Sequence, residues 1–457
     1  MQMSYRRVFV LALFVALATA PTQAAVDNIF RASETTINLD DLLRVHGNLR
    51  YGLNYTNDFL EAPAYTHHDF RTRLTLNILP KEKEQGVVEL QAWKVLGSGG
   101  GESSGAFDPT VAISQMYISV DDCLGRNIGG RIGHMRYQVA NERIIGDESW
   151  DISRSYDGGL FYLGDKKMFT HYDEVQNPND PNWIERIEVM KGAPKPEYGT
   201  GLGGELLLFK VDENAIAGDD DHDFMGLNIF VPKIGLMPFA YYDRDNFMIG
   251  GHRRVHLYTL GTYGRFDIGK NLLIEGNFGL QTGKVRFGPD DEDKQDISAY
   301  LLQADAFFYM GEYERPLAFG VGIDMTSGDD GEDEDKYKLW SDQFGSSHEP
   351  LGRADLFGGM LVYGVTDLIG RIAYYPSKKM KTGLDLHMLR SSVEYSTGVD
   401  DETSKSIGME LDFFLRYDMH QRTGWSWELN YFKPSEDWAG PDPESYMSII
   451  MRAHFSF

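Results

Sequence analysis

The chain has little cysteine and, after its first 20 residues, no long hydrophobic run. Cys123 is the single cysteine in 457 residues, which excludes an internal disulfide framework and a cysteine-rich metal site. No later stretch approaches the ~18 to 20 consecutive apolar residues that a membrane-spanning helix needs. Basic residues are also scarce, 44 against 69 acidic ones, and the net charge of -25 argues against nucleic acid as a partner.

The first residues have the pattern of an export signal. Arg6 and Arg7 precede the apolar run Val8 to Ala20, and the small residue Ala24 follows shortly after. This order is typical of a secretory signal peptide. We therefore predict a signal peptide at residues 1–24 and a mature protein that begins at Ala25.

Several segments alternate apolar and polar residues. In Leu43 to Tyr55, leucines and tyrosines alternate with Arg44, His46, Asn48 and Arg50. Because successive side chains of a strand point to opposite faces, this pattern predicts strands with one lipid face and one polar face. The same alternation recurs at Phe70 to Ile78, Leu272 to Thr282, Tyr300 to Met310, Met409 to Tyr417 and Trp425 to Tyr431.

The last predicted strand, Met447 to Phe457, has an unbroken apolar face that ends on an aromatic residue. Such an ending resembles the signal that the outer-membrane assembly machinery recognises. The fold class that we predict is all-β: a transmembrane antiparallel barrel over residues 25–457, in contact with outer-membrane lipid. At roughly 24 residues per strand and connection it would have about 18 strands, with 16 to 20 as the range.

Acidic residues cluster in four predicted loops, at Asp219 to Asp223, Asp290 to Asp296, Asp329 to Asp335 and Asp400 to Glu402. Outer-membrane barrels have short turns on the periplasmic side and long loops outside, so we expect these acidic loops to face outside. Asp329 to Asp335 offers many oxygen ligands for Ca²⁺ but lacks an ordered ligand spacing, so a solvated loop is the preferred interpretation. No other cofactor is expected.

Two stretches resemble the alginate-export family of outer-membrane porins. Gly130 to Tyr162 combines a Gly-Arg strand, a polar loop, a Trp, an Arg and "YDG", and Ser346 to Arg390 combines His, Gly and Asp before a "DL" strand and a "PS" turn. The resemblance implies an 18-stranded barrel that passes an anionic saccharide, a uronate polymer such as alginate, through an arginine-rich constriction.

The substrate-binding residues that we predict are of two origins. The resemblance implies Arg131, Arg136, Arg143, Arg154 and Asp157 in the first stretch and His348, Arg353, Asp355 and Arg371 in the second. The alternation of apolar and polar residues, which we call strand parity, adds Arg50, Arg71 and Arg73 on the polar faces of two predicted strands. A guanidinium is permanently charged and can bind a carboxylate at two points. The alternative for each residue is an ion pair between neighbouring strands that only satisfies the buried charges.

Other functions remain open at this stage. Acidic outer loops would repel a polyanion, so a general or uptake porin for small solutes also fits the residues. Ile184 to Phe209 is similar to the plug of TonB-dependent receptors, but it lies mid-chain with too few residues behind it for a 22-stranded barrel, and it could instead form a partial plug. His67, His68, His134 and His171 have no metal-ligand spacing, and we expect neither a metal site nor an enzyme.

Overall fold

The computed structural model describes most of the chain after residue 41. The described residues are 42–57, 64–79, 83–96, 110–122, 127–146, 154–164, 202–213, 221–245, 254–269, 271–287, 294–311, 317–342, 344–345, 351–356, 362–377, 379–397, 402–420 and 422–456. In these ranges no helix has the length and apolar character needed to cross a membrane. The predicted signal peptide, Cys123, His348 and Phe457 lie outside them.

Within the described residues the fold is a ring of strands. In chain order they are β1 Leu43–Thr56, β2 Tyr65–Ile78, β3 Glu84–Leu96, β4 Thr110–Val120, β5 Ile128–Met135, β6 Tyr156–Leu163, β7 Gly203–Glu213, β8 Asp221–Phe230, β9 Leu236–Asp245, β10 Arg254–Ile268, β11 Leu272–Arg286, β12 Lys294–Met310, β13 Leu317–Thr326, the short β14 Lys336–Tyr337, β15 Thr366–Ser377, β16 Met380–Ser396, β17 Thr403–His420, β18 Thr423–Pro434 and β19 Tyr446–Ser456. Two short helical turns, η4 Pro232–Ile234 and α5 Glu436–Ala439, lie between strands.

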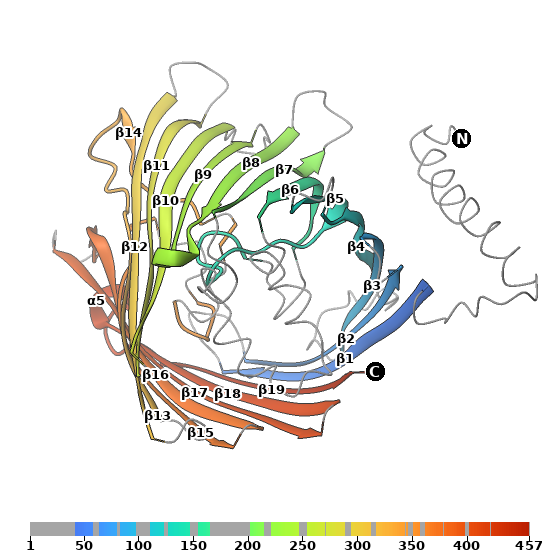
Figure 1. Ribbon diagram of the computed structural model, residues 1–457. Coiled ribbons are helices and arrows are strands. Elements are labelled where there is room, and N and C mark those ends of the chain that lie inside the picture. The colour runs from blue at the N-terminus through green and yellow to red at the C-terminus, as the bar shows by residue number, and fades with distance from the viewer. Residues whose placement is uncertain are drawn as a thin grey trace, which may run out of the picture.

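The ring is closed. Each long strand pairs antiparallel with its neighbour in sequence, and β1 pairs with β19 from Asn48 opposite Ser456 to Thr56 opposite Ser448. The two-residue β14 joins β12 in parallel and lies outside this series. Without it, 18 described strands form a closed antiparallel barrel, as predicted, and Figure 1 shows them surrounding a central lumen.

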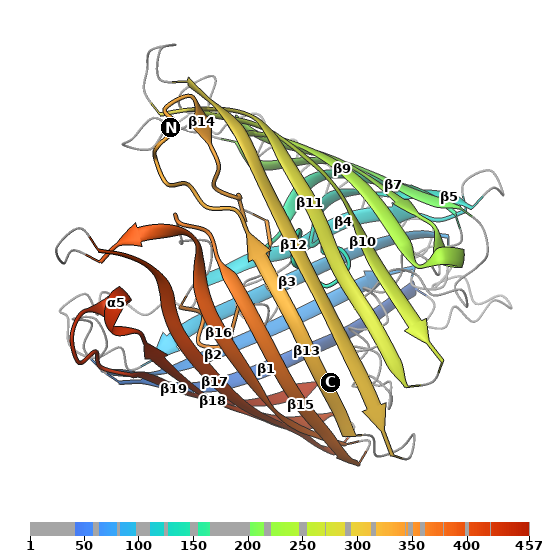
Figure 2. The ribbon, with the colours of Figure 1, turned by 90° about the vertical axis from the view of Figure 1, so that its left-hand side faces the viewer.

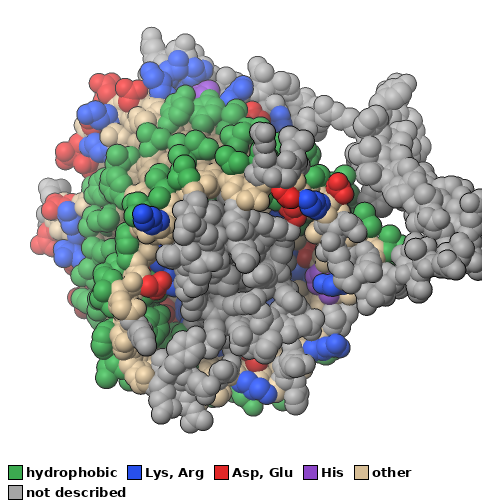
Figure 3. Space-filling view, viewed as in Figure 1, with side chains coloured by type: hydrophobic (Ala, Val, Ile, Leu, Met, Phe, Trp, Pro, Cys, Tyr) green, Lys and Arg blue, Asp and Glu red, His purple; other side chains and the backbone are tan. Residues whose placement is uncertain are grey.

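Alternation along each strand separates the two faces of the wall. On β11, Phe278 and Leu280 are exposed on the outside, whereas Asn277 and Gln281 are buried on the inside. Exposed leucines, isoleucines and phenylalanines of this kind occur on nearly every strand and form the hydrophobic outer surface in Figure 3. A large apolar exterior around a polar interior is the arrangement of a barrel in lipid.

Connections alternate between the two ends of the barrel because neighbouring strands are antiparallel. At one end they are short, as between β10 and β11 (residues 269–271), except for the connection between β6 and β7 (residues 164–202). All four acidic clusters occur at the other end, in or beside the connections β7–β8, β11–β12, β13–β15 and β16–β17. They therefore share the end that the rule for outer-membrane barrels places outside.

The stretch Ile184 to Phe209, which resembles the plug of a TonB-dependent receptor, is a strand of the barrel wall in its described part. Its residues Gly203–Phe209 belong to β7 and pair with β6 and β8 as part of the wall. Residues 184–201 lie outside the described part of the chain. A ring of 18 strands also excludes the 22-stranded barrel of a TonB-dependent receptor.

Candidate functional site

A stretch after β5 folds into the lumen and connects distant parts of the wall. We call residues 136–146 the first inner segment. Arg136 donates from Nη2 to Glu89 Oε2 of β3 (3.1 Å), and Tyr137 donates from its hydroxyl to Glu205 Oε2 of β7 (2.7 Å). Asn141 Nδ2 then donates to Gln303 Oε1 of β12 (2.8 Å). The segment thus runs from β3 to β12 inside the ring, as Figure 1 shows.

Arg143 fixes the far end of this segment. Its Nε and Nη2 donate to the two carboxylate oxygens of Asp324 on β13 at 2.6 and 3.1 Å, and its Nη1 donates to Asp342 Oδ1 at 2.7 Å. The side chains of Arg143 and Asp324 are almost completely buried. A two-point arginine–carboxylate bond of this kind is strong and directional, so it fixes the position of the segment.

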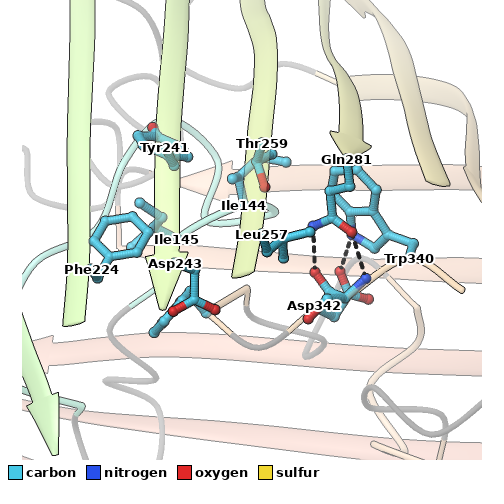
Figure 4. Close-up of a pocket in the computed structure, with 12 residues that line it drawn as sticks. Ile144, Ile145, Phe224, Tyr241, Asp243, Leu257, Thr259, Gln281, Trp340 and Asp342 are labelled. Atoms are coloured by element: carbon cyan, nitrogen blue, oxygen red, sulfur yellow. Dashed lines mark hydrogen bonds between the residues drawn. The ribbon is translucent and has the colours of Figure 1, made fainter. Parts of the chain in front are cut away.

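Residues 338–342 with 344 and 345 form the second inner segment, which follows β14. Trp340 Nε1 donates to Asp342 Oδ1 (2.7 Å), and Gln281 of β11 exchanges two hydrogen bonds with the backbone of Ser341. Between the two inner segments and strands β8–β11 lies a small pocket, shown in Figure 4. Its apolar lining comes from Ile144, Ile145, Phe224, Tyr241, Leu257, Trp340 and Phe344.

A third inner segment, residues 351–356, lies against β16–β18. The backbone N–H of Arg353 donates to Asp412 Oδ2 (3.0 Å) and that of Ala354 to Glu410 Oε1 (2.9 Å). The Arg353 guanidinium lies 4.4 Å from the centre of the Phe414 ring and within 4 Å of carboxylates of Asp385 and Glu428. The carboxylates of the wall therefore anchor this segment through both its backbone and its arginine.

The lumen wall has a basic sector on β19, β1 and β2. Arg50 of β1 lies directly opposite Arg71 of β2, and Arg73 follows on the same face. All three are buried inside the barrel. Nearby acids offset part of this charge: Arg50 contacts Asp69 at 3.2 Å, and Arg73 lies 3.9 Å from Glu89.

An acidic sector covers β12 to β17. Asp324 lies opposite Asp367, and Asp385 lies opposite Asp412. Asp305 and Glu410 complete the group, and all six carboxylates are buried. The basic side chains that contact them include Arg143, Arg353, Arg371 and the imidazole of His387.

Aromatic side chains line the third sector, on β6 to β10. Tyr156 stacks on Phe209 with ring centres 5.1 Å apart, and Phe239 stacks on Tyr241 at 4.9 Å. Phe344 of the second inner segment packs on Phe224 of this sector at 4.8 Å. The three sectors give a solute in the lumen a cationic, an anionic and an apolar surface.

Most predicted site residues meet in this lumen. Arg50, Arg71, Arg73, Arg131 and Arg371 lie on the inner faces of β1, β2, β5 and β15, and Arg136, Arg143, Arg353 and Asp355 lie in the first and third inner segments. Arg131 is 5.3 Å from the ring centre of Tyr117, and Arg371 pairs with Asp305. Arg154 is partly buried next to the start of β6.

The prediction that Asp157 faces the lumen is wrong. In β6 the inward positions are the even-numbered ones, such as Tyr156 and Leu160, so Asp157 points outward. Its side chain is 71% exposed and pairs with His134 of β5 at 2.9 Å. The "YDG" motif thus places its tyrosine, rather than its aspartate, inside the barrel.

Arg265 of β10, Arg416 of β17 and Arg452 of β19 are lumen arginines that were not selected from the sequence. Arg416 of β17 and Arg452 of β19 face inward, and Arg452 lies 3.8 Å from Glu428. Strand parity places both on polar faces, so alternation alone could have identified them. Asp324, Asp367 and His387 were also not selected, although Asp367 and His387 lie within the stretch Ser346 to Arg390 that carried the resemblance.

The acidic stretch Asp329 to Asp335 forms turns in the described structure. Asp329 and Asp330 accept hydrogen bonds from the backbone N–H of Gly331 and Glu332, and Lys338 Nζ lies 3.1 Å from Asp330. No trio of His, Cys, Asp or Glu side chains in the described residues has the arrangement of a metal site. We do not propose calcium binding.

Comparison with solved structures identifies the architecture. Similar structures are OccAB1 of Acinetobacter baumannii (9% identity, TM-score 0.55, covering 91% of this chain and 96% of that chain) and the outer membrane protein OprD of Pseudomonas aeruginosa (11%, 0.52, 91% and 94%). OccK11 (OpdR) of P. aeruginosa is similar to the same degree (11%, 0.52, 90% and 96%). At such identities the matches establish the fold, a closed 18-strand antiparallel barrel like those of outer-membrane porins, which confirms the predicted architecture. Together with the apolar outer surface of the described strands, this fold agrees with the predicted location in the outer membrane.

The resemblance to the alginate-export family is wrong. No family model and no curated protein matches the chain, and the similar structures are porins of the OprD and Occ type. The first motif has a structural explanation instead. Gly133 and Gly158 lie opposite each other with positive φ, and a Cβ at either would collide with the backbone of the next strand. Glycine at these positions is explained by the close packing of neighbouring strands. The motif is therefore no evidence for a particular transported solute.

Proposed function

We propose that the protein is a porin through which small anionic solutes, above all carboxylates, cross the outer membrane. The observation that carries this proposal is the pair Arg50 and Arg71, two buried arginines directly opposite each other on the lumen wall. Like charges in opposed positions destabilise a sheet, so a fold that retains them gains something else from them. A carboxylate solute that binds between two guanidiniums would supply that gain.

The basic sector offers such a solute several successive contacts. Arg73 and Arg136 lie around Glu89, and Arg50 is next to Asp69. Because these acids compete for the same guanidiniums, an anion would be attracted without being held tightly. Fast passage through a channel requires this balance between entry and release.

The inner segments support small solutes over polymers. The first inner segment is bonded to β3 at one end and to β13 at the other, so it narrows the passage with fixed side chains. The similarity to OprD and Occ porins also favours a porin for small solutes over a polymer exporter. Because no described feature couples the channel to an energy source, we propose passage down the concentration gradient.

Planar-bilayer recordings with the purified protein test this proposal. A KCl gradient should give a reversal potential of anion-selective sign, and glucuronate should reduce the KCl current more than its neutral counterpart glucose. The double change Arg50→Gln with Arg71→Gln should remove most of the selectivity. Lys379→Gln, an exposed cation in a short turn, is the control and should leave it unchanged. Cation selectivity in the unaltered protein would refute the proposal.

A further inference from the structure

Two acidic residues of β17, Glu410 and Asp412, are neighbours on the inner face of the wall. They are two positions apart in one strand, so both side chains point into the barrel, where both are completely buried. Their carboxyl groups are within hydrogen-bonding reach of each other. The inward positions on either side of them, Gly408 and Phe414, carry no charge. We call Glu410 and Asp412 the acid pair; Figure 2 shows their strand between β16 and β18.

Each carboxyl group of the acid pair holds the third inner segment with one oxygen only. Glu410 Oε1 accepts the backbone N–H of Ala354 at 2.9 Å, and Asp412 Oδ2 accepts that of Arg353 at 3.0 Å. The other two oxygens, Glu410 Oε2 and Asp412 Oδ1, are buried and have no hydrogen-bond partner in the part of the chain that the structure describes. A buried polar atom without a partner is costly, so two of them in one pair require an explanation.

The neighbouring imidazole does not satisfy these oxygens. His387 of β16 lies directly opposite Glu410 and is completely buried as well. Its Nδ1 is 2.6 Å from Asp367 Oδ2, whereas its Nε2 is 3.7 Å from Asp412 Oδ2, too far for a hydrogen bond. The other charged groups that face this site from the described elements around it are Asp385 of β16, Glu428 of β18 and Arg353 of the third inner segment.

One proton satisfies both oxygens at once. A proton on Glu410 Oε2 that is donated to Asp412 Oδ1 gives each oxygen a partner and leaves the acid pair with a single negative charge. Two carboxyl groups that share one site avoid their mutual repulsion in this way. Both contacts with the third inner segment remain, because they use the other two oxygens.

We propose that the acid pair binds one proton at neutral pH and that this proton keeps the third inner segment attached to the wall. At alkaline pH the proton leaves and the two carboxylates repel each other. A second charge would strengthen one hydrogen bond to the backbone, but the repulsion between two charges in a poorly solvated site is the larger effect. The contacts with Arg353 and Ala354 then weaken, and the segment moves within the lumen.

Infrared spectroscopy of the purified, folded protein tests for the proton directly. A protonated carboxyl group has a carbonyl band that a carboxylate lacks. We expect Glu410→Gln and Asp412→Asn each to reduce this band at neutral pH, because neither variant retains two carboxyl groups that share a proton. Glu332→Gln, which changes an exposed loop residue, is the control and should leave the band unchanged. A band of full intensity in either acid-pair variant would overturn the inference.

Planar-bilayer recordings test the attachment of the segment. The current noise of the unaltered protein and of Glu332→Gln should rise reversibly when the pH is raised from neutral to alkaline. Glu410→Gln should abolish this rise, because glutamine reproduces the protonated side chain: its Oε1 accepts the N–H of Ala354 and its Nε2 donates to Asp412. A rise that persists in Glu410→Gln, or no rise in the unaltered protein, would contradict the proposed attachment.

The two experiments separate this inference from the function proposed above. The recordings rest on the proposed channel function, whereas the infrared band does not depend on conduction. A protein that conducts no ions but loses the band in both acid-pair variants would refute the channel and retain the bound proton. Unchanged heat-dependent mobility on gels establishes that each variant is folded, so a lost band cannot be attributed to lost structure.

Discussion

Arg50 and Arg71 lie directly opposite each other on β1 and β2, and both side chains face the lumen. This relationship places two permanent positive charges on one small area of the wall. The reach of such charges into an aqueous lumen depends on ionic strength, because the Debye length is ~10 Å at 0.1 M salt and ~3 Å at 1 M.

We therefore expect anion selectivity to fall as salt rises. Reversal potentials measured with the same concentration ratio at about 0.1 M and about 1 M KCl should show a clear decrease at the higher concentration. Equal selectivity at both concentrations would mean that pore size or tight contact, rather than the field of the arginines, determines ion preference.

Arg143→Met should release the first inner segment. The change leaves Asp324 buried without its two-point partner, and breaking a buried ion pair costs roughly 3 to 5 kcal/mol. We expect larger or noisier single-channel currents and an earlier thermal transition. Lys336→Met is the control, because Lys336 and its partner Asp333 lie outside the inner segments with exposed side chains, and both properties should stay unchanged. Currents identical to those of the unaltered protein would show that the segment does not limit conduction.

Asp305→Asn and Asp157→Asn should differ in their effects. Asp305 faces the lumen and pairs with Arg371, so its neutralisation should shift the reversal potential towards anions. Asp157 points outward next to His134, so Asp157→Asn should leave the channel unchanged. A similar shift in both variants would contradict the orientation of β6.

Export should remove the first 24 residues. Arg6, Arg7, the apolar run to Ala20 and Ala24 predict cleavage before Ala25. The intact mass of the protein purified from outer membranes should match a chain that begins at Ala25. A mass that includes Val8 to Ala20 would show that the segment is retained.

Strand parity in the sequence was sufficient to predict the fold. Leu43 to Tyr55 and Leu272 to Thr282 lie within β1 and β11, with their polar residues inside. Alternation is a local property of each strand, and a closed barrel in lipid imposes it on every strand. The same reasoning placed Arg50, Arg71 and Arg73 in the lumen.

The inner segments were much harder to predict. Neither alternation nor a motif indicates that Arg143 would meet Asp324, because the contact joins a connection after β5 to strand β13, far away in the chain. The error at Asp157 has a related cause. The resemblance assigned a role to a motif without considering the strand position that determines which residue faces inward.

The first inner segment has a consequence for how the barrel forms. Arg143 and Asp324 are separated by 181 positions in the chain, so their ion pair cannot form until β13 is in place. Contacts of such long sequence separation form slowly, because a large loop must first close. We therefore expect the lumen to be wide in early folding intermediates and to become narrow only after β13 has joined the wall.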